Sequence, residues 1–261
     1  MSATKTRSAP ALDRALTLLE LLSQSRHGLT LPELSERTNL PRSSVHYLLV
    51  TLERRGYLHR NQRTSRYRFG QQVLALASGA VPALDMQQMA APYLRRLVAQ
   101  TGLTAHMAVL DRDAAVVIAR SESPHPSRVP TWVGRRINLH STSLGKALIA
   151  SLPPAELDEL LAAHPLARHN QNTMTSPARL REELMRVAGL GHAVDNEEEE
   201  LGLRCVGAPV WGERGVVASV SVSGPASAIA AERVEELARI VKNTGAALSA
   251  ALTQQPLGIG A

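Results

Sequence analysis

Residues 29–58, LTLPELSERTNLPRSSVHYLLVTLERRGYL, decide the predicted fold. A short helix is expected after Thr30, because Glu33 follows three residues later and completes a capping-box pattern. Asn-Leu-Pro at 39–41 predicts a tight turn, and Pro41 then opens a second helix at its first position, where the missing N–H costs nothing. Gly56 ends that second helix. The stretch therefore predicts a helical hairpin.

The second helix of this hairpin is amphipathic. Its apolar residues recur at i, i+3, i+4 and i+7 and predict one buried stripe: Val45, Leu48, Leu49 and Leu52. Polar, hydroxyl and imidazole side chains crowd its first turns: Arg42, Ser43, Ser44, His46 and Tyr47. The N-terminal turns of a recognition helix approach base edges in the major groove. The plainer alternative is an ordinary helical hairpin with a solvated face.

The segment after the hairpin favours DNA binding. Residues 57–60 and 66–69 are expected to form two strands around a polar turn at 61–65. Four arginines are concentrated there, within reach of phosphates or a minor groove: Arg60, Arg63, Arg66 and Arg68. A first helix over 12–25 is expected to bury Leu12, Ala15, Leu16, Leu19 and Leu22. Three helices and a basic two-stranded wing predict a winged helix-turn-helix, with Thr30 included among its DNA contacts.

The charge distribution supports the same prediction. Residues 1–70 hold 12 Lys and Arg against 5 Asp and Glu, a balance of +7, whereas residues 71–261 hold 17 against 18, a balance of −1. The excess positive charge therefore lies in the segment that contains the helical hairpin. Phosphate contacts dominate nucleic-acid affinity, so double-stranded DNA is the predicted partner, in preference to a membrane surface.

The bulk composition is that of a globular protein. A chain of 261 residues with 44% hydrophobic and 20% charged residues suits two modest domains with their own cores. The single cysteine, Cys205, excludes an intramolecular disulfide and fits a reducing cytoplasm. Neither a signal peptide nor a membrane span is expected, so the predicted location is cytoplasmic, at the nucleoid when bound to DNA.

The predicted domain boundaries follow the motifs. A disordered basic arm (1–11), the winged helix-turn-helix (12–70), a linker helix (71–84), a second domain (85–253) and a disordered tail (254–261) are expected. In the second domain we expect helices over 85–101, 141–150, 154–163, 177–188 and 231–252, and strands over 104–110, 115–119, 129–133, 192–196, 204–210 and 216–223. Helices around a mainly antiparallel sheet predict the α/β (α+β) class for the whole chain.

One strand of the second domain points to a ligand cavity. Alternation places Ser219, Ser221 and Ser223 on one face of it and valines on the other. Three hydroxyls in a row line either a polar cavity or a solvated face. The neighbouring strand places Cys205 and Gly207 on one face and Arg204 and Val206 on the other, and it ends in Ala-Pro. A small cavity bounded by Leu203 and Leu144 is therefore the favoured interpretation.

Other chemistries fit these residues less well. Gly145-Lys146 lacks the glycine that a phosphate-binding loop requires five residues earlier. The acidic run 197–200 could ligate a metal with His192 or Asp195, but consecutive carboxylates cannot all point at one ion. Cys205 with a distant histidine could form a nucleophilic pair, although a buried thiol is usually inert. His106 and His140 are interpreted as core or loop histidines. No cofactor, metal or catalytic residue is predicted.

The sequence of both domains resembles the IclR family of bacterial transcription regulators. The first domain carries ALDRALTLLELL and GLTLPELSERTNLPRSSVHYLLVTLERRGYL, and the second carries LHSTSLGKALIA (139–150), GHAVDNEEEELGLRCVGAPV (191–210) and SVSGP (221–225). The resemblance covers residues 12–252. It implies a GAF-like effector domain, dimers or tetramers on palindromic operators, and effectors that are small carboxylates or aromatic acids.

The resemblance also implies where the effector binds. The family's effector contacts carry over onto Ser143, Leu144, Asp195, Leu203, Cys205, Ser221 and Ser223. Ser143 to Lys146 open a helix, so the free N–H groups there, including that of Gly145, are expected to receive a carboxylate.

The functional hypothesis is a ligand-responsive transcriptional regulator, not an enzyme, that forms a homodimer or tetramer. Two alternatives stay open: a small-molecule enzyme carrying a DNA-binding head, and a ligand-independent architectural DNA binder.

Overall fold

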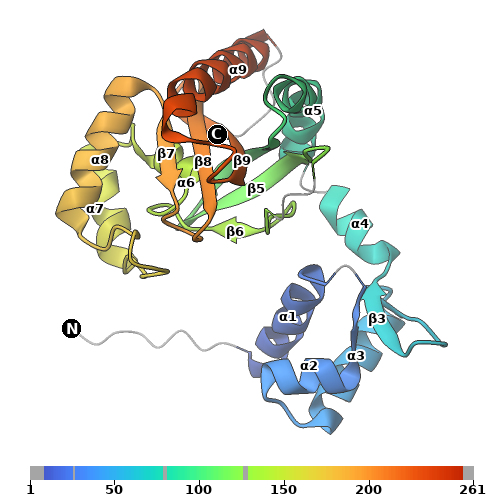
Figure 1. Cartoon of the computed structure of the whole chain (residues 1–261). Helices are drawn as coiled ribbons and strands as arrows, with labels where there is room; N and C mark the ends of the chain where they lie inside the picture. The colour runs from blue at the N-terminus through green and yellow to red at the C-terminus, as the bar shows by residue number, and fades with distance from the viewer. Residues whose placement is uncertain (1–8, 26, 79–80, 126–128, 255–261) are drawn as a thin grey trace. The chain divides into compact units, whose positions relative to one another are not determined.

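The computed structural model describes residues 9–25, 27–78, 81–125 and 129–254. The chain divides into two compact units, Met1–Val81 and Pro82–Ala261 (Figure 1). Of the predicted arm (1–11) and tail (254–261), residues 1–8 and 255–261 lie outside the described residues; Pro10 and Ala11 instead begin a helix, and Gln254 ends one. Within the described residues, no helix is both long enough and apolar enough to cross a membrane.

The N-terminal unit is a winged helix-turn-helix. Its elements in chain order are α1 (Pro10–Ser23), β1 (Leu29–Thr30), α2 (Leu31–Thr38), α3 (Arg42–Arg54), β2 (Leu58–Arg60), β3 (Arg66–Phe69) and α4 (Gln71–Ser78). The strands form one antiparallel sheet in the order β1-β3-β2. Strand β1 was not predicted; its two residues pair as Leu29 with Tyr67 and Thr30 with Arg66.

The helical hairpin forms where the sequence predicts it. Thr30 caps α2, and its side chain and that of Glu33 complete the reciprocal capping box. Asn39 then turns the chain in the left-handed region, with φ of 53°. Pro41 is the N-cap of α3 rather than its first helical residue, with extended backbone angles. Gly56, at φ of 76°, follows the end of α3.

The face of α1 that is buried differs from the prediction. Leu18 and Leu22 are buried, whereas Leu12 and Leu16 are 60% and 48% exposed. Leu16 lies two residues from Leu18, about 200° around the helix, and therefore points to the opposite side. The core of the unit is completed by buried residues from the other elements: Leu29, Leu34, Val45, Leu49, Leu58 and Tyr67.

The junction between the units contains two helices. Helix α4 ends at Ser78, residues 79–80 are not described, and α5 (Val81–Thr101) follows. Helix α5 therefore begins four residues before the predicted start at Asp85. Pro82 lies in its first turn, where proline is tolerated, and does not break the helix.

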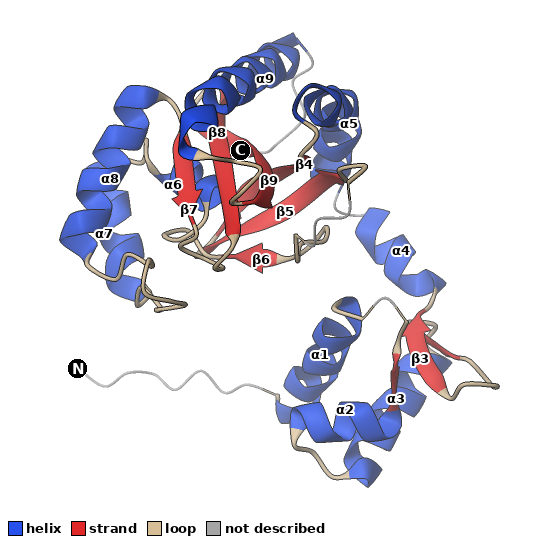
Figure 2. Ribbon diagram, viewed as in Figure 1, coloured by secondary structure: helices blue, strands red, loops and turns tan. Residues whose placement is uncertain are grey.

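The C-terminal unit is built on an antiparallel six-stranded sheet in the order β6-β5-β4-β9-β8-β7 (Figure 2). Its strands are β4 (Thr104–Asp111), β5 (Ala114–Ser121), β6 (Arg136–Ile137), β7 (Ala193–Asn196), β8 (Leu203–Gly212) and β9 (Gly215–Pro225). The helical elements besides α5 are α6 (Ser143–Ile149), α7 (Pro154–Ala163), α8 (Pro177–Leu190), the 3-10 turn η1 (Ala231–Arg233) and α9 (Val234–Gln254).

The strand predicted over 129–133 does not form. Thr131 N donates to Val129 O at 2.8 Å, which closes a tight turn, and Pro130 between them has no N–H for a ladder. The strand that pairs with β5 is instead β6, through Ile137 opposite Ala115.

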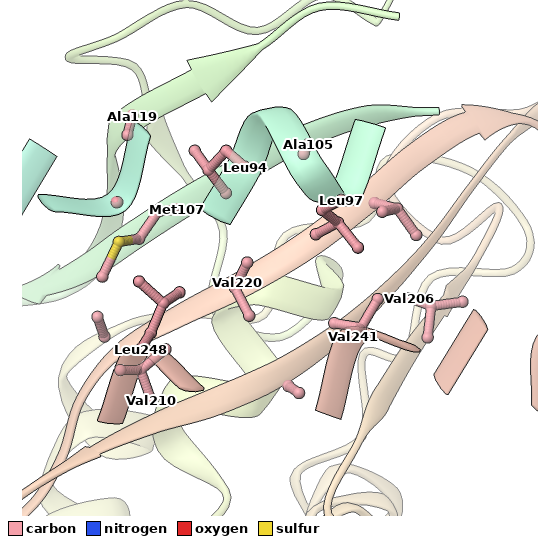
Figure 3. Close-up of a cluster of buried hydrophobic side chains, with 14 of the residues drawn as sticks. Leu94, Leu97, Ala105, Met107, Ala119, Val206, Val210, Val220, Val241 and Leu248 are labelled. Carbon is pink, nitrogen blue, oxygen red and sulfur yellow. The ribbon is translucent and has the colours of Figure 1, made fainter. Parts of the chain in front are cut away.

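Helices cover both faces of the sheet. Helices α5 and α9 pack on one face, where Leu94, Leu97, Val220, Val241 and Leu248 belong to one buried cluster (Figure 3). Leu144, Leu148, Leu180 and Leu184, from α6 and α8, pack in a second cluster with Ala108 and Val117 of the sheet. Strand β9 is therefore buried on both faces, and its serines face α6 rather than solvent.

Candidate functional site

The outer face of α3 is exposed as the sequence predicts. Tyr47 is 73% exposed, Arg42, Ser43 and His46 are also exposed, and Ser44 is half-buried. The rings of His46 and Tyr47 lie edge to face, with centroids 6.1 Å apart. The first turns of α3 thus present a guanidinium, hydroxyls, an imidazole and a phenol to solvent, which is the donor and acceptor set that base edges require.

The turn between β2 and β3 presents arginines. Asn61 Oδ1 accepts hydrogen bonds from the backbone N–H groups of Arg63 and Thr64 at 3.0 and 2.9 Å and holds the turn. Arg60 donates to Ser65 Oγ at 3.1 Å. The Arg63 side chain is exposed and has no hydrogen bond or ion pair with another described residue. Both arginines are exposed at this turn.

Two further predicted DNA contacts, Arg66 and Thr30, also hydrogen-bond within the N-terminal unit. Arg66 Nη1 donates to Gly28 O at 2.7 Å and pairs with Glu33. The Thr30 hydroxyl donates to Glu33 Oε2 at 2.8 Å and accepts from Glu33 N. Arg66 thus joins β3 to the start of α2, and the Thr30 hydroxyl is used in the cap of α2.

A cavity with both polar and apolar walls lies in the C-terminal unit between the sheet and the start of α6. The space that the centre of a water molecule can occupy inside it is about 60 Å³. Seven of the eight predicted effector residues line it: Ser143, Leu144, Asp195, Leu203, Cys205, Ser221 and Ser223. Nine further residues line it that were not assigned to it: His106, Val129, Pro130, Thr131, Arg135, Ile137, Thr142, Glu199 and Glu200.

Sheet pairing brings the cavity residues together. Asp195, Cys205 and Ser223 are direct neighbours across β7, β8 and β9, so their side chains share one face. Ser221 pairs with His106 of β4 in the next row. His106 therefore lines the cavity, although its sequence context suggested a core histidine; without the strand order, nothing linked it to the serine strand.

Gly145 is the predicted effector residue that does not line the cavity. Its N–H donates to Thr142 Oγ1 at 3.0 Å, and the next N–H, of Lys146, donates to Thr142 O at 2.9 Å. A Cβ at Gly145 would lie 2.5 Å from Asn138 O and 2.5 Å from Leu139 Cα. Gly145 therefore allows α6 to approach the preceding backbone, and its N–H is already bonded.

Buried hydroxyls form the floor of the cavity. Ser221 is fully buried, and its Oγ has no hydrogen-bond partner among the described residues. Ser223 Oγ lies 3.5 Å from His106 Nδ1, and His106 Nε2 lies 2.6 Å from Thr131 Oγ1. An unpaired buried hydroxyl is costly unless something else hydrogen-bonds to it, and Ser221 differs from the equally unpaired Ser219 in lining the cavity.

Burial sets the protonation states around the cavity. Burial raises the pKa of Asp195 to about 7, and the nearby Glu198 carboxyl adds to this. Burial, with the Asp195 carboxyl, raises the pKa of the Cys205 thiol well above its usual value. Burial and the guanidinium groups of Arg120 and Arg135 lower the pKa of His106 to about 3. Cys205 thus stays a thiol, which is unsuited to nucleophilic catalysis.

The acidic run after β7 separates its carboxylates. Glu198 pairs with the fully buried Lys146 at 2.7 Å, and Glu199 accepts from Ser141 Oγ at 2.5 Å. Glu197 accepts from the N–H of Gly202 at 2.8 Å. Across the described ranges, no three His, Cys, Asp or Glu side chains are arranged to hold a metal ion.

Comparisons with known proteins agree with this architecture. Residues 78–250 match the family described as bacterial transcriptional regulator IclR C-terminal, and residues 11–62 match the IclR helix-turn-helix domain. HTH-type transcriptional regulator BhcR of Paracoccus denitrificans (strain Pd 1222) is 35% identical over 240 residues, which cover 92% of this chain and 86% of BhcR. Transcriptional repressor IclR of Escherichia coli (strain K12) is 31% identical over 243 residues, with 92% and 89% covered.

Solved structures have the same fold. The Thermotoga maritima IclR structure has a TM-score of 0.75 and 30% identity, and covers 93% of this chain and 98% of its own. An IclR homolog from Microbacterium hydrocarbonoxydans, complexed with 4-hydroxybenzoate, has a TM-score of 0.79 and 25% identity, with 93% and 98% covered. These relatives are regulators with a helix-turn-helix domain and an effector-binding domain. The chain belongs to the IclR family of bacterial transcriptional regulators.

Proposed function

We propose that this protein binds operator DNA sequence-specifically and that a small organic acid in the cavity of the C-terminal unit changes its affinity for the operator. The observation that carries the proposal is the fully buried Ser221 hydroxyl, which has no hydrogen-bond partner among the described residues and lines a cavity together with Arg135, Asp195 and Glu199. A cavity of this kind suits a small polar ligand better than it suits a structural core.

The DNA part of the proposal rests on α3 and the wing. Arg42, Ser43, Ser44, His46 and Tyr47 would contact base edges and nearby phosphates, because they form the free face of the recognition helix. Arg60 and Arg63 would neutralise phosphates. Arg66 and Thr30 would act on DNA binding by fixing the position of the wing.

The ligand part rests on the size and polarity of the cavity. A relative with the same fold binds 4-hydroxybenzoate, so carboxylates and aromatic acids are the classes to test first. The ligand would act by binding one arrangement of a homodimer, or a tetramer, more tightly than another, and so would change the fit to a palindromic operator.

A binding titration tests the DNA part. At physiological salt the protein should prefer DNA from upstream of its own gene to a scrambled duplex by at least about a thousandfold. Arg42→Ala should weaken operator binding, whereas Arg239→Ala removes the same charge from the exposed face of α9 and should have little effect. Equal affinity for both duplexes would contradict the proposal.

A matched pair of serine variants tests the ligand part. Ser221 and Ser219 lie on the same strand and are both fully buried. Neither hydroxyl has a hydrogen-bond partner among the described residues, but of the two only Ser221 lines the cavity. In a thermal-shift screen of small acids, Ser221→Ala should weaken the response and Ser219→Ala should preserve it. A ligand-independent architectural binder predicts that no acid shifts either unfolding or operator affinity.

A further inference from the structure

The cavity of the C-terminal unit has two chemically different ends. We infer that its ligand is a dipolar acid, with a carboxylate near Arg135 and a hydrogen-bond donor, hydroxyl or ammonium, near Asp195 and Glu200. The inference rests on the proposed function only in taking this cavity as the effector site.

The first end of the cavity is cationic. Arg135 lines it, has no ion pair with a described residue, and lies over the Trp132 ring at 5.1 Å. Arg120, the cross-strand neighbour of His106, pairs with Glu122 through Nη1 at 2.9 Å, and its Nε is buried with no hydrogen-bond partner among the described residues. His106 adds no charge, because its low pKa keeps the imidazole neutral. A guanidinium with free donors favours a carboxylate here.

The opposite end is rich in carboxyl groups. Asp195, Glu199 and Glu200 all line the cavity. One oxygen of Asp195 accepts from Glu198 N at 2.8 Å. Glu199 accepts hydrogen bonds from the Asn138 amide and the Ser141 hydroxyl. Lys146 pairs with Glu183 and Glu198, neither of which lines the cavity. Above about pH 7, where Asp195 is ionised as well, acceptors dominate this end, so it favours a donor and repels a second anion.

The sheet keeps the two ends apart. His106 lies on β4 and Asp195 on β7, and β9 and β8 lie between these strands. Three strand spacings place these two backbones about 14 Å apart, and the side chains that line the cavity occupy part of that distance, which leaves room for a short ligand. Ser221 and Cys205 occupy the interval, and Ser221 Oγ is unpaired. A plain acid would leave the acceptors unmatched, and a dicarboxylate would place a charge against them.

Two isosteric ligand series test the inference by calorimetry on the full chain. The three-carbon series is propionate, 3-hydroxypropionate, 3-aminopropionate and malonate, and the four-carbon series is butyrate, 4-hydroxybutyrate, 4-aminobutyrate and succinate. In at least one series a donor-bearing acid should bind about tenfold or more tighter than both the plain acid and the dicarboxylate. The hydroxy and amino members show which donor is used.

Charge-matched variants locate the carboxylate. Arg135→Gln should weaken the best acid about tenfold, whereas Arg136→Gln removes the same charge from a residue paired with Asp111 and Asp113 outside the cavity and should leave affinity unchanged. Ligand-free unfolding of each variant checks the fold.

The inference is overturned if a plain acid or dicarboxylate binds as tightly as the donor-bearing acids. It is equally overturned if none of these saturates at millimolar concentration, or if the two variants behave alike. Operator binding without ligand is measured separately, so a failure of the regulator proposal is distinguishable.

Discussion

Arg66 and Glu33 form a two-pronged ion pair that joins the wing to the start of the helix-turn-helix. Arg66 Nη1 lies 3.1 Å from Glu33 Oε2, and Nη2 lies 3.1 Å from Oε1. Glu33 Oε2 also accepts from Thr30 N at 2.7 Å. One carboxylate therefore completes the cap of α2 and anchors β3, and such fork-shaped pairing requires arginine.

The arginines of the wing are therefore expected to differ in role. Arg66→Gln should lower the thermal unfolding midpoint of the N-terminal unit, because it removes the anchor of β3. Arg63→Gln should leave the midpoint unchanged, but should weaken operator binding and reduce the slope of log affinity against log salt by about 1. Unfolding scans and salt titrations on both variants check this; an unchanged midpoint for Arg66→Gln would refute the anchoring role.

Lys146 is expected to hold the acidic run in place. It is fully buried, and its Nζ donates to Glu198 at 2.7 Å and to Val194 O at 2.5 Å. Lys146→Met leaves the Glu198 carboxyl buried without its cation, which should cost about 3–5 kcal/mol in the free energy of unfolding. Adding Glu198→Gln should restore part of that loss in denaturant titrations. A double variant less stable than the single one would show that the pair is not the source.

Local periodicity predicted the features that depend on a single element. The exposed face of α3, the Thr30 cap and the serine face of β9 each follow from spacing within a few residues of chain. Leu12 and Leu16 show the limit of the method. Several leucine stripes are possible on α1, and only packing against the rest of the unit selects the one through Leu18.

Features that join distant segments were not predictable from spacing. Arg66 pairs with Glu33, which lies 33 residues earlier in the chain. From the sequence alone, Arg66 was predicted to contact a phosphate. His106 lines the cavity because β4 lies beside β9, and Arg135 lines it from the loop before β6. Family resemblance selected seven residues that line the cavity, whereas Gly145, predicted from the free N–H groups of the helix start, lies where α6 packs closely against the preceding backbone.

Asp195 is expected to make stability depend on pH. Because its pKa rises from 3.8 to about 7 on folding, the folded state holds a proton that the unfolded state releases. The stability from this group is full below about pH 4, declines as the pH rises toward 7, and is then lost. The free energy of unfolding of the wild type minus that of Asp195→Asn should fall by on the order of 4 kcal/mol between pH 4 and 8.

An oppositely shifted carboxyl provides the control for this titration. The pKa of Asp113 is lowered by its backbone hydrogen bond and by His164 and Arg136. Its contribution is present above pH 3.8 and is lost at lower pH. The same difference taken with Asp113→Asn should therefore be flat between pH 5 and 8. A flat difference for Asp195→Asn as well would mean that Asp195 is ionised in the folded protein.

Gly145 and Gly189 offer the last test, because the same substitution should have opposite effects at the two glycines. Alanine at 145 would press its Cβ against the backbone of Asn138 and Leu139, at 2.5 Å in each case, and should cost about 1–3 kcal/mol. At Gly189, inside α8, a Cβ meets nothing within 4 Å, so Gly189→Ala should stabilise by about 0.4–1 kcal/mol. Urea titrations measure both. If Gly145→Ala keeps full stability yet loses ligand binding, Gly145 contacts the ligand directly and the packing role assigned to it is wrong.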